Sequence, residues 1–441
     1  MIFENIMKNK TVSVWGLGYL GYTTIFKLQT SGFKVKVYDL NAGQLKAFTG
    51  GRYPDNNQKA TWSLNGFLPK LDYPAIQVAK SAEEMFKDSC LHIIAMPESR
   101  KNTGKDTIAS RMAVIFARNI KKSGTVPLVI FESAFIPGNI QKNFIDKLRK
   151  ERITVSKDYH VGVFFRADWS VEAFIGKKDK MPVAGCCPKG SEAIRRLLEH
   201  LGLPVIMLDS IKDAEIYANS MNVIQAMAID FLRQLAMGYP FVNMKKMSKA
   251  LFGNISLADC ELNIGTGGER MTFSTDYLIE GSDKPGNLTL LKEFQDIGIS
   301  SVLSYADYII RHGYKSVEIL GITYKGNQKD LTLSPSVTLA DYLIKNGLKV
   351  SICDPYCTVD EIRRYIKGVT VRSFPSKVFS SDVVVVASDH NQYKCIAPQK
   401  VRDAKNKVKL IIDNYGIWEH LRFEDPIRYH QVGDGSLDLS K

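Results

Sequence analysis

Thr11–Trp15 (TVSVW) runs directly into Gly16–Gly21 (GLGYLG), and this stretch decides the fold. The first part is a short, β-branched run typical of a buried strand, and residues 22–30 after the glycines have helical character. Lys34–Tyr38 (KVKVY) then reads as a second strand that ends at Asp39. Strand, glycine turn, helix, strand and acid follow in the order that makes a G-x-G-x-x-G motif informative. The sequence therefore predicts a βαβ unit that binds a dinucleotide.

Each residue of this turn has a predicted role. Gly16 permits the tight bend, Gly18 lets the backbone approach a pyrophosphate, and Gly21 lets the helix lie close to the strand. The N-terminus of the helix adds N–H donors and a positive dipole end. Asp39 can accept hydrogen bonds from an adenosine ribose and would repel a 2′-phosphate. We therefore expect NAD rather than NADP, with FAD as the minor competitor.

Alternating strands and helices continue outward from this unit. The apolar runs at 91–95 and 128–131 are predicted strands, with a helical stretch between them at 108–121. Two long helices are predicted at 213–237 and 288–311, and strand–helix alternation resumes at Lys315. This pattern predicts an α/β protein with two Rossmann-like, doubly wound parallel sheets joined by a central helical segment. The expected domains are residues 1–209, 210–312 and 313–441.

The bulk composition excludes several classes of protein. The 441 residues have an ordinary hydrophobic fraction of 45%, and no apolar run approaches the ~20 residues that span a bilayer. The N-terminus lacks the apolar core of a signal peptide, so we expect a cytoplasmic protein. The seven cysteines are odd in number and lack metal-type spacing, which indicates reduced thiols and no metal site. The net charge of +13 is dispersed and by itself leaves nucleic acid, an anionic membrane or phosphorylated small ligands open.

Short motifs are spread along the whole chain: Gly16–Gly21, Ala95–Glu98 (AMPE), Glu132–Gly138 (ESAFIPG), Gly321–Gly326 (GITYKG) with Asp330, Asp354–Tyr356 and Ser388–His390. Together they resemble the motifs of the UDP-glucose/GDP-mannose dehydrogenase family. The resemblance implies an N-terminal NAD domain, a helical segment that forms a homodimer, and a C-terminal domain that holds the nucleotide of a sugar substrate. Both expected ligands carry a pyrophosphate, so we expect neither nucleic acid nor a membrane as a partner.

The resemblance also implies site residues. For the cofactor these are Gly16, Gly18, Tyr19, Leu20, Gly21, Asp39, Pro97 and Ser133. For the substrate they are Phe164, Arg166, Asn222, Gly267, Gly268 and Lys325.

The chain departs from the family in its catalytic set. The cysteine of G-F-G-G-x-C-L-P-K-D is Arg270 here, and the aspartate that follows it is Ser274. A guanidinium cannot form the thioester-type intermediate that the second oxidation of the family needs. Further changed positions lie in four other motifs: Ala134 for a threonine, Val163 and Ala167 for two carboxylates, Ala218 for a lysine, and Thr332 for an arginine. Asn222 is kept.

Some nearby groups are candidate substitutes. Cys260 lies outside a glycine turn, so a relocated nucleophile is the weaker interpretation. Asp168 or Glu172 could supply a displaced carboxylate, although charges on a solvated loop or helix explain both. Arg270, with Glu269 beside it, could bind phosphate or carboxylate. Tyr217 is a core candidate, and His160 and His390 are lone histidines with a structural role. The candidate catalytic residues are therefore Asn222, Asp168 and Arg270.

Two functions remain open at this point. The first is an NAD-dependent oxidoreductase on a CH–OH group of a UDP- or GDP-sugar, in surface polysaccharide or nucleotide-sugar biosynthesis. Its step would be a two-electron or redox-neutral one, because hydride transfer needs no cysteine. The second is a non-catalytic paralogue that binds NAD and a nucleotide sugar in a regulatory or scaffolding role. The intact glycine turn and Asp39 favour the enzyme, and Arg270 argues against the four-electron oxidation to a uronic acid.

Overall fold

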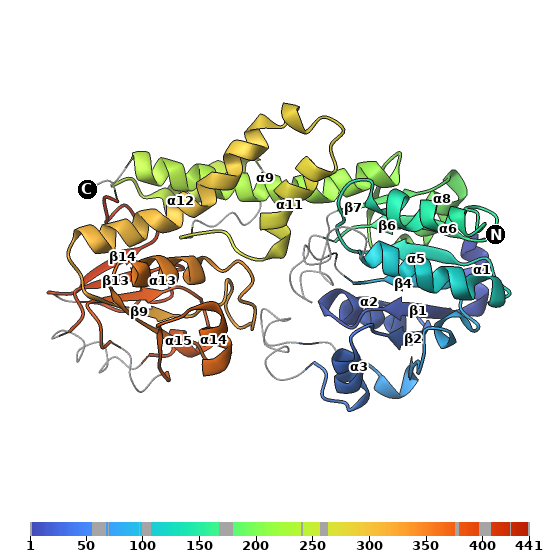
Figure 1. Ribbon diagram of the computed structural model, residues 1–441, viewed down its shortest axis with the longest axis horizontal. Helices are drawn as coiled ribbons and strands as arrows, with labels where there is room; N and C mark the ends of the chain where they lie inside the picture. The colour runs from blue at the N-terminus through green and yellow to red at the C-terminus, as the bar shows by residue number, and fades with distance from the viewer. Residues whose placement is uncertain are drawn as a thin grey trace. The chain divides into compact units, whose positions relative to one another are not determined.

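A computed structural model describes residues 2–54, 68, 70–96, 98, 107–166, 180–239, 241–255, 263–374, 379–396, 407–423 and 425–439. The chain divides into two compact units (Figure 1). The first consists of Met1–Met221 with Asp276–Pro285, and the second of Asn222–Thr275 with Gly286–Lys441. Two of the three boundaries fall within helices, α9 (Ile211–Gly238) and α11 (Glu269–Glu280), and the third falls in the short 3-10 turn Pro285–Asn287. The three-part division at 209/210 and 312/313 stays a prediction.

The described residues of the first unit form one eight-stranded sheet in the order β3-β2-β1-β4-β5-β6-β7-β8. Its strands are β1 (Thr11–Trp15), β2 (Lys34–Tyr38), β3 (Ile76–Val78), β4 (Leu91–Ile94), β5 (Leu128–Phe131), β6 (His160–Phe164), β7 (Met181–Gly185) and β8 (Val205–Met207). Its helices are α1 (Ile2–Asn9), α2 (Tyr19–Thr30), α3 (Ala42–Thr49), α5 (Ile108–Asn119), α6 (Asp146–Lys150) and α8 (Pro188–His200). All neighbouring strands are parallel except β6 and β7. The first six strands have the order of a dinucleotide-binding fold.

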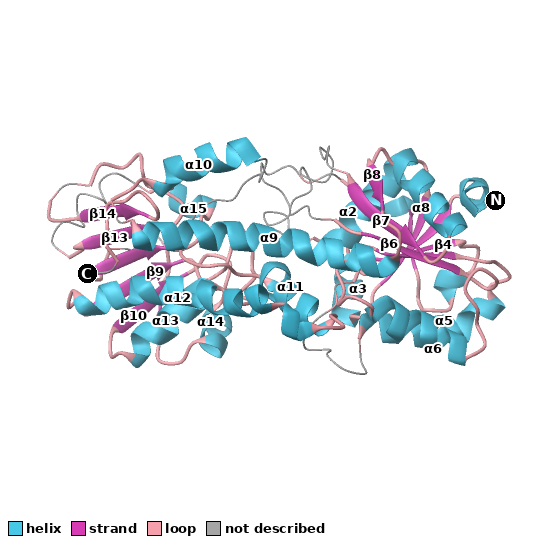
Figure 2. Cartoon of the chain, turned by 90° about the horizontal axis from the view of Figure 1, so that it is seen from above, coloured by secondary structure: helices cyan, strands magenta, loops and turns pink. Residues whose placement is uncertain are grey.

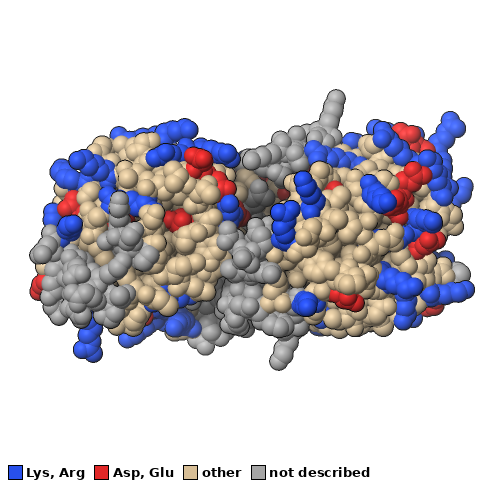
Figure 3. All heavy atoms as spheres, turned by 90° about the horizontal axis from the view of Figure 1, so that it is seen from below, with Lys and Arg blue, Asp and Glu red and all other residues tan. Residues whose placement is uncertain are grey.

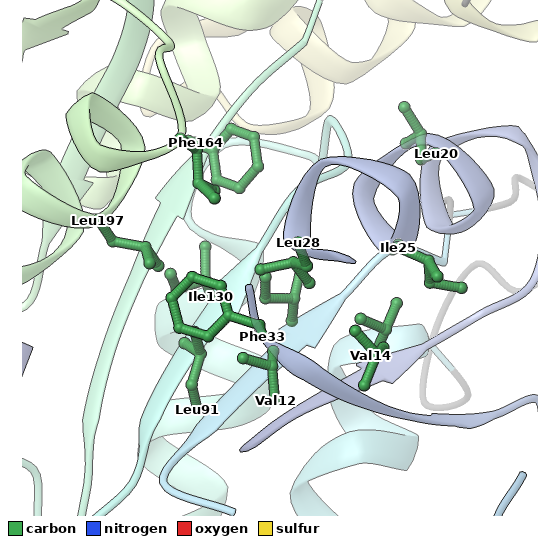
Figure 4. Packing of buried hydrophobic residues seen from close by; sticks show 14 of the residues in the cluster. Val12, Val14, Leu20, Ile25, Leu28, Phe33, Leu91, Ile130, Phe164 and Leu197 are labelled. Carbon is green, nitrogen blue, oxygen red and sulfur yellow. The ribbon is translucent and has the colours of Figure 1, made fainter. Parts of the chain in front are cut away.

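Alternation along the strands divides the core of this unit into two layers. Leu128 and Ile130 of β5 face one layer, which α2 and α8 cover, whereas Val129 and Phe131 face the other, which α5 and α6 cover. Figure 2 shows these helix pairs on opposite sides of the sheet. In Figure 4, side chains of α2 such as Leu28 point at the strand residues. Helices on both faces explain why a central strand such as β5 is apolar and buried at every residue.

The described residues of the second unit form a six-stranded parallel sheet in the order β11-β10-β9-β12-β13-β14. Its strands are β9 (Ser316–Leu320), β10 (Lys349–Cys353), β11 (Thr370–Val371), β12 (Val383–Val386), β13 (Leu410–Asp413) and β14 (Arg428–Gln431). Its helices, besides parts of α9 and α11, are α10 (Met244–Ile255), α12 (Thr289–Arg311), α13 (Pro335–Lys345), α14 (Val359–Tyr365) and α15 (Asn391–Lys394). The strand order repeats that of the first six strands of the first sheet. In both sheets the order of successive strands therefore reverses beside the first strand, β1 or β9.

The predicted fold class is confirmed: both units are α/β folds built on doubly wound, mainly parallel sheets. Local signals explain several boundaries. Pro335 occupies the first turn of α13, where its missing N–H costs no hydrogen bond. A capping box between Thr358 and Glu361 begins α14. In the described part of the chain, we find no helix with the length and apolarity that a membrane span requires.

Charged side chains of both signs are interspersed on the face shown in Figure 3. Lys and Arg outnumber Asp and Glu by 59 to 46, yet this view shows them spread over the surface rather than gathered in one patch. The excess positive charge therefore does not point to a single docking surface on this face.

Candidate functional site

The glycine turn lies at the carboxyl end of β1, where the strand order reverses between β1 and β4. Gly16 has a φ of +102°, and a Cβ there would lie 2.7 Å from Met96 Cγ. A Cβ on Gly21 would lie 1.9 Å from the carbonyl oxygen of Gly16. By contrast, a Cβ on Gly18, the N-cap of α2, would meet no atom within 4 Å. The turn is thus closed on its protein side and open beside the N-terminus of α2.

Asp39, directly after β2, supports this turn. Its Oδ2 accepts a hydrogen bond from the Leu17 N–H at 2.7 Å, and its Oδ1 accepts one from the Asn41 N–H at 2.7 Å. A carboxylate has about four acceptor sites, so the half-buried Asp39 keeps capacity for further donors. The same side chain can therefore fix the turn and accept the hydroxyls of a ribose.

A buried hydroxyl lies at the same edge of the sheet. Ser133 follows β5, is 4% exposed, and its Oγ has no hydrogen-bond partner among the described residues. A buried polar group without a partner costs about 1–3 kcal/mol, so this position suits a polar atom of a ligand. The open space beside Gly18, the carboxylate of Asp39 and the hydroxyl of Ser133 together fit a dinucleotide. Tyr19 and Leu20 form the first turn of α2, and Pro97 lies outside the described residues.

Arg166 is held in a buried ion pair that the sequence did not reveal. Its Nη1 lies 2.7 Å from Glu132 Oε1, and neither side chain is exposed to solvent. Thr24 of α2 donates to the same carboxylate oxygen at 2.6 Å, and Arg166 also donates to Thr24 Oγ1 at 3.1 Å. The pair ties the ends of β5 and β6 to α2, beneath the glycine turn. Phe164 is likewise buried, and the substrate-binding roles of Arg166 and Phe164 stay predictions.

Glu215 of α9 is a second buried carboxylate in the first unit. Its oxygens accept hydrogen bonds from Gly138 N at 2.6 Å and Ile140 N at 3.2 Å, at the end of the ESAFIPG motif. Burial raises the pKa of Glu215 to about 7, although these two hydrogen bonds and the charge of Lys212 act in the opposite direction. The neutral form of Glu215 is therefore favoured by the fold.

The raised pKa of Glu215 should make the protein less stable as the pH rises. Because the pKa of Glu215 is about 7 in the fold and 4.5 without it, stability present below pH 4.5 is lost as pH rises towards 7. The shift corresponds to about 3 kcal/mol of unfolding free energy. We expect Glu215→Gln to remove this decline in urea unfolding at acidic and mildly alkaline pH. Glu280→Gln, at an exposed position, should keep the wild-type dependence. Parallel pH profiles of Glu215→Gln and wild type would contradict the assignment.

Two motif positions meet in the second unit. Asn222 of α9 donates from Nδ2 to Ser274 Oγ of α11 at 3.0 Å, and Ser274 is 1% exposed. These positions correspond to the asparagine and the aspartate of the resemblance, which lie in separate motifs. The hydrogen bond fixes one side of the Asn222 amide. No local sequence pattern indicates this pairing, because the residues are 52 positions apart.

The segment before α11 is anchored by Arg233, which pairs with Asp230 in the buried part of α9. Arg233 donates to Asn263 O at 2.8 Å and to Thr266 Oγ1 at 2.9 Å.

Gly267 and Gly268 then lie against Tyr324. A Cβ on Gly267 would be 2.6 Å from Tyr324 Cβ, and a Cβ on Gly268 would be 2.8 Å from its Cζ. Helix α11 begins directly after them at Glu269. Arg270 therefore lies on its first turn, although its side chain is outside the described set.

The loops after β9 and β12 meet where the second sheet reverses its strand order. Gly326 N donates to Asp389 Oδ1 at 2.8 Å, and Asn327 N donates to His390 Nδ1 at 2.8 Å. Because Nδ1 accepts, the proton of His390 is on Nε2, which lies 3.2 Å from Asp354 Oδ2. His390 thus has a structural role. Lys325 lies half-buried on the same loop, next to Tyr324.

Burial alone would raise the pKa of Asp354. The hydrogen bond from His390 and those from the N–H groups of Ile322 and Tyr356 outweigh this effect and lower the pKa of Asp354. The carboxylate is therefore ionised and fully engaged by the protein. In folds of this kind ligands bind at the carboxyl ends of the strands where the strand order reverses, so we expect a ligand of this unit at the carboxyl ends of β9 and β12.

Three candidate side chains named from the sequence, Asp168, Glu172 and Cys260, lie outside the described residues. Within the described ranges, no group of three or more His, Cys, Asp or Glu side chains is arranged to hold a metal ion.

Comparison with known proteins relates this chain to a group of enzymes. Residues 318–420 match the UDP binding domain of the UDP-glucose/GDP-mannose dehydrogenase family. The UDP-N-acetyl-D-mannosamine dehydrogenase of Methanocaldococcus jannaschii is 23% identical, over 97% of each chain. In structure, the chain is similar to a UDP-glucose dehydrogenase from Pyrobaculum islandicum, with 18% identity and a TM-score of 0.78 over 96% of this chain and 97% of that one. The UDP-D-ManNAc dehydrogenase of Pyrococcus horikoshii gives 20% identity and a TM-score of 0.74 over 97% and 100%.

Proposed function

We propose that this chain is a member of the UDP-glucose/GDP-mannose dehydrogenase family and an NAD-dependent oxidoreductase acting on a CH–OH group of a nucleotide-linked sugar. The observation that carries this proposal is the glycine turn, which is closed around Gly16 and Gly21 and open beside Gly18. The homodimer, the cytoplasmic location and a role in surface polysaccharide or nucleotide-sugar biosynthesis belong to the same proposal.

In this proposal the first unit binds NAD. The N–H groups at the start of α2 face the pyrophosphate, Asp39 accepts the adenosine ribose hydroxyls, and Ser133 meets a polar atom near the nicotinamide. The negative charge of Asp39 is the reason why NAD is preferred over NADP. The second unit binds the nucleotide of the sugar at the carboxyl edge of β9 and β12, with Lys325 as a cation for its phosphates.

The reaction is a two-electron or redox-neutral step. Bound NAD supplies a hydride acceptor, and a single alcohol oxidation needs in addition only an oriented C–H bond and a proton acceptor. Arg270 stands where a thiol would have to trap an aldehyde for a second oxidation, and it has no nucleophilic sulfur. The amide of Asn222, oriented by Ser274, is placed to hold a sugar hydroxyl, and Asp168 is the candidate proton acceptor.

The test is turnover with a panel of UDP- and GDP-sugars. The purified protein is incubated with NAD and each sugar while the absorbance of the reduced nicotinamide is followed. A parallel reaction in deuterated water is analysed for deuterium in the sugar, because a redox-neutral step leaves the absorbance flat. One substrate that gives either signal supports the proposal. Tight NAD binding with neither signal for any sugar would overturn it and favour the non-catalytic paralogue.

A control variant addresses a relocated nucleophile. Cys260→Ala should keep the turnover of the wild type, because a two-electron step uses no thiol. Loss of turnover in Cys260→Ala with sugar binding intact would contradict the cysteine-free chemistry. Asp168→Asn should lower turnover without weakening NAD binding, which separates proton transfer from cofactor binding.

A further inference from the structure

Three side chains that the proposed function does not use gather at the start of α8. Cys186 and Cys187 connect β7 to this helix, and Cys187 is its N-cap. Cys187 Sγ lies 3.8 Å from His160 Nδ1 and 4.0 Å from Cys186 Sγ. Both cysteines are half-buried and both are free thiols. Two sulfurs and an imidazole therefore share one small part of the surface of the first unit.

This cluster lies at the edge of the sheet opposite the glycine turn. β6 runs parallel to β1 through β4 and β5, so its first residue, His160, is at the amino edge. β7 is antiparallel to β6, so Cys186, directly after it, returns to the same edge. The cluster is therefore separate from the candidate NAD site, and it does not depend on the proposed function.

The two thiols have opposite surroundings. Burial acts to raise the pKa of Cys187, but the Ser156 hydroxyl, neighbouring Cys186 and the N–H groups of Gly190 and Lys189 outweigh it and lower the pKa. For Cys186, burial dominates and raises the pKa to about 12. Of the two sulfurs, Cys187 is therefore the one that ionises more readily. The thiolate is the reactive form of a cysteine.

A glycine and a lysine of α8 lie beside the two sulfurs. Gly190 lies beneath both sulfurs: a Cβ there would be 3.6 Å from Cys187 Sγ and 3.9 Å from Cys186 Sγ. Lys189, exposed on the first turn of α8, adds a positive charge to the positive end of the helix. An incoming group with negative charge is therefore favoured over a cationic one.

We propose that Cys187 is an S-thiolation site, where an anionic low-molecular-weight disulfide of the glutathione type forms a mixed disulfide. The Cys187 thiolate attacks one sulfur of the disulfide, a new S–S bond forms, the old S–S bond breaks, and the other half leaves as a thiolate. Cys187 is oxidised and the departing half is reduced, so no further reagent is needed. A bond between Cys186 and Cys187 is disfavoured, because adjacent Cα atoms are about 3.8 Å apart and disulfides usually need 4.4–6.8 Å.

The experiment compares Cys187 with Cys395, which is exposed and serves as an internal reference. The folded protein is incubated with glutathione disulfide near neutral pH, quenched with acid and mapped by mass spectrometry. We expect Cys187 to be modified roughly tenfold faster than Cys395, with the ratio falling at alkaline pH as other thiols ionise. Cystamine, a cationic disulfide, should show a smaller preference for Cys187. In urea the two cysteines should react alike.

Two variants separate activation from simple exposure. Ser156→Ala and His160→Asn should slow the modification of Cys187 several-fold and leave Cys395 unchanged. Faster reaction of Cys395 in the folded protein near neutral pH would overturn the proposal. So would equal preference for glutathione disulfide and cystamine, or recovery of a Cys186–Cys187 disulfide as the main product.

Discussion

Arg166→Met is expected to destabilise the first unit by about 3–5 kcal/mol, because it leaves the Glu132 carboxylate in the core without its guanidinium. For a domain of this size, that loss lowers the unfolding temperature by roughly 6–20 °C. Both side chains are fully buried, so solvent cannot take the place of the missing partner. The measurement is differential scanning calorimetry of the full chain, in which the first unit should unfold earlier than in the wild type.

A double variant tests the cause of this loss. Arg166→Met with Glu132→Gln removes the charge together with its partner, and we expect it to recover most of the lost stability. Arg149→Met is the matched control, since Arg149 pairs with Asp146 on the surface and exposed pairs contribute about 0–1 kcal/mol. An unfolding temperature of Arg166→Met equal to that of the wild type would show that the pair is not a structural element.

Gly18→Ala is expected to weaken NAD binding roughly a hundredfold, or by about 3 kcal/mol, while the protein still folds. Its φ of −70° is open to any residue, and the added Cβ would meet no protein atom within 4 Å. The methyl group would instead occupy the space that a pyrophosphate needs at the N-terminus of α2. Isothermal titration calorimetry with NAD measures the affinity, and thermal unfolding without NAD shows that the fold is intact.

Alanine substitutions at two further glycines serve as controls for Gly18→Ala. Gly21→Ala should lose stability as well as binding, because its Cβ would lie 1.9 Å from Gly16 O and the backbone must move. Gly286→Ala, also in open space but in the second unit, should change neither property. Unaltered NAD affinity in Gly18→Ala would exclude the turn as the pyrophosphate site.

The sequence predicted those parts of the fold that depend on local pattern. Lys34–Tyr38 and Leu128–Phe131 are strands at the expected residues. The first shows the two-residue alternation of a strand, and the second is a continuous apolar run. The helix predicted from residue 22 begins at Tyr19 instead, since Gly21 is accommodated inside α2 for its close approach to Gly16.

Other elements were not predicted because tertiary contacts stabilise them. Helix α1 lies at the N-terminus, and its Phe3 contacts the ring of His200 and the guanidinium of Arg196 on α8. Strand β7 contains Pro182 and pairs with β6 in the antiparallel sense, so its pattern differs from that of the other strands.

The same distinction holds for the candidate site. The glycine turn and Asp39 are adjacent in the motif, so spacing alone indicated them. The pair of Arg166 and Glu132 spans 34 residues, and the hydrogen bond between Asn222 and Ser274 spans 52. Neither has a periodic or local signature. Partners of this kind follow from strand order and helix packing, which a single sequence does not specify.

The carboxylates at the ends of β2 and β10 determine how many dinucleotides one chain can bind. In both sheets the carboxylate accepts the N–H that follows the first glycine after the leading strand: Leu17 N for Asp39 and Ile322 N for Asp354. Asp354 also engages His390, Tyr356 N and Cys357 N, which fills all four of its acceptor sites. Of these two carboxylates, Asp39 keeps acceptor capacity among the described residues, so under the proposed function we expect one adenosine-ribose site per chain.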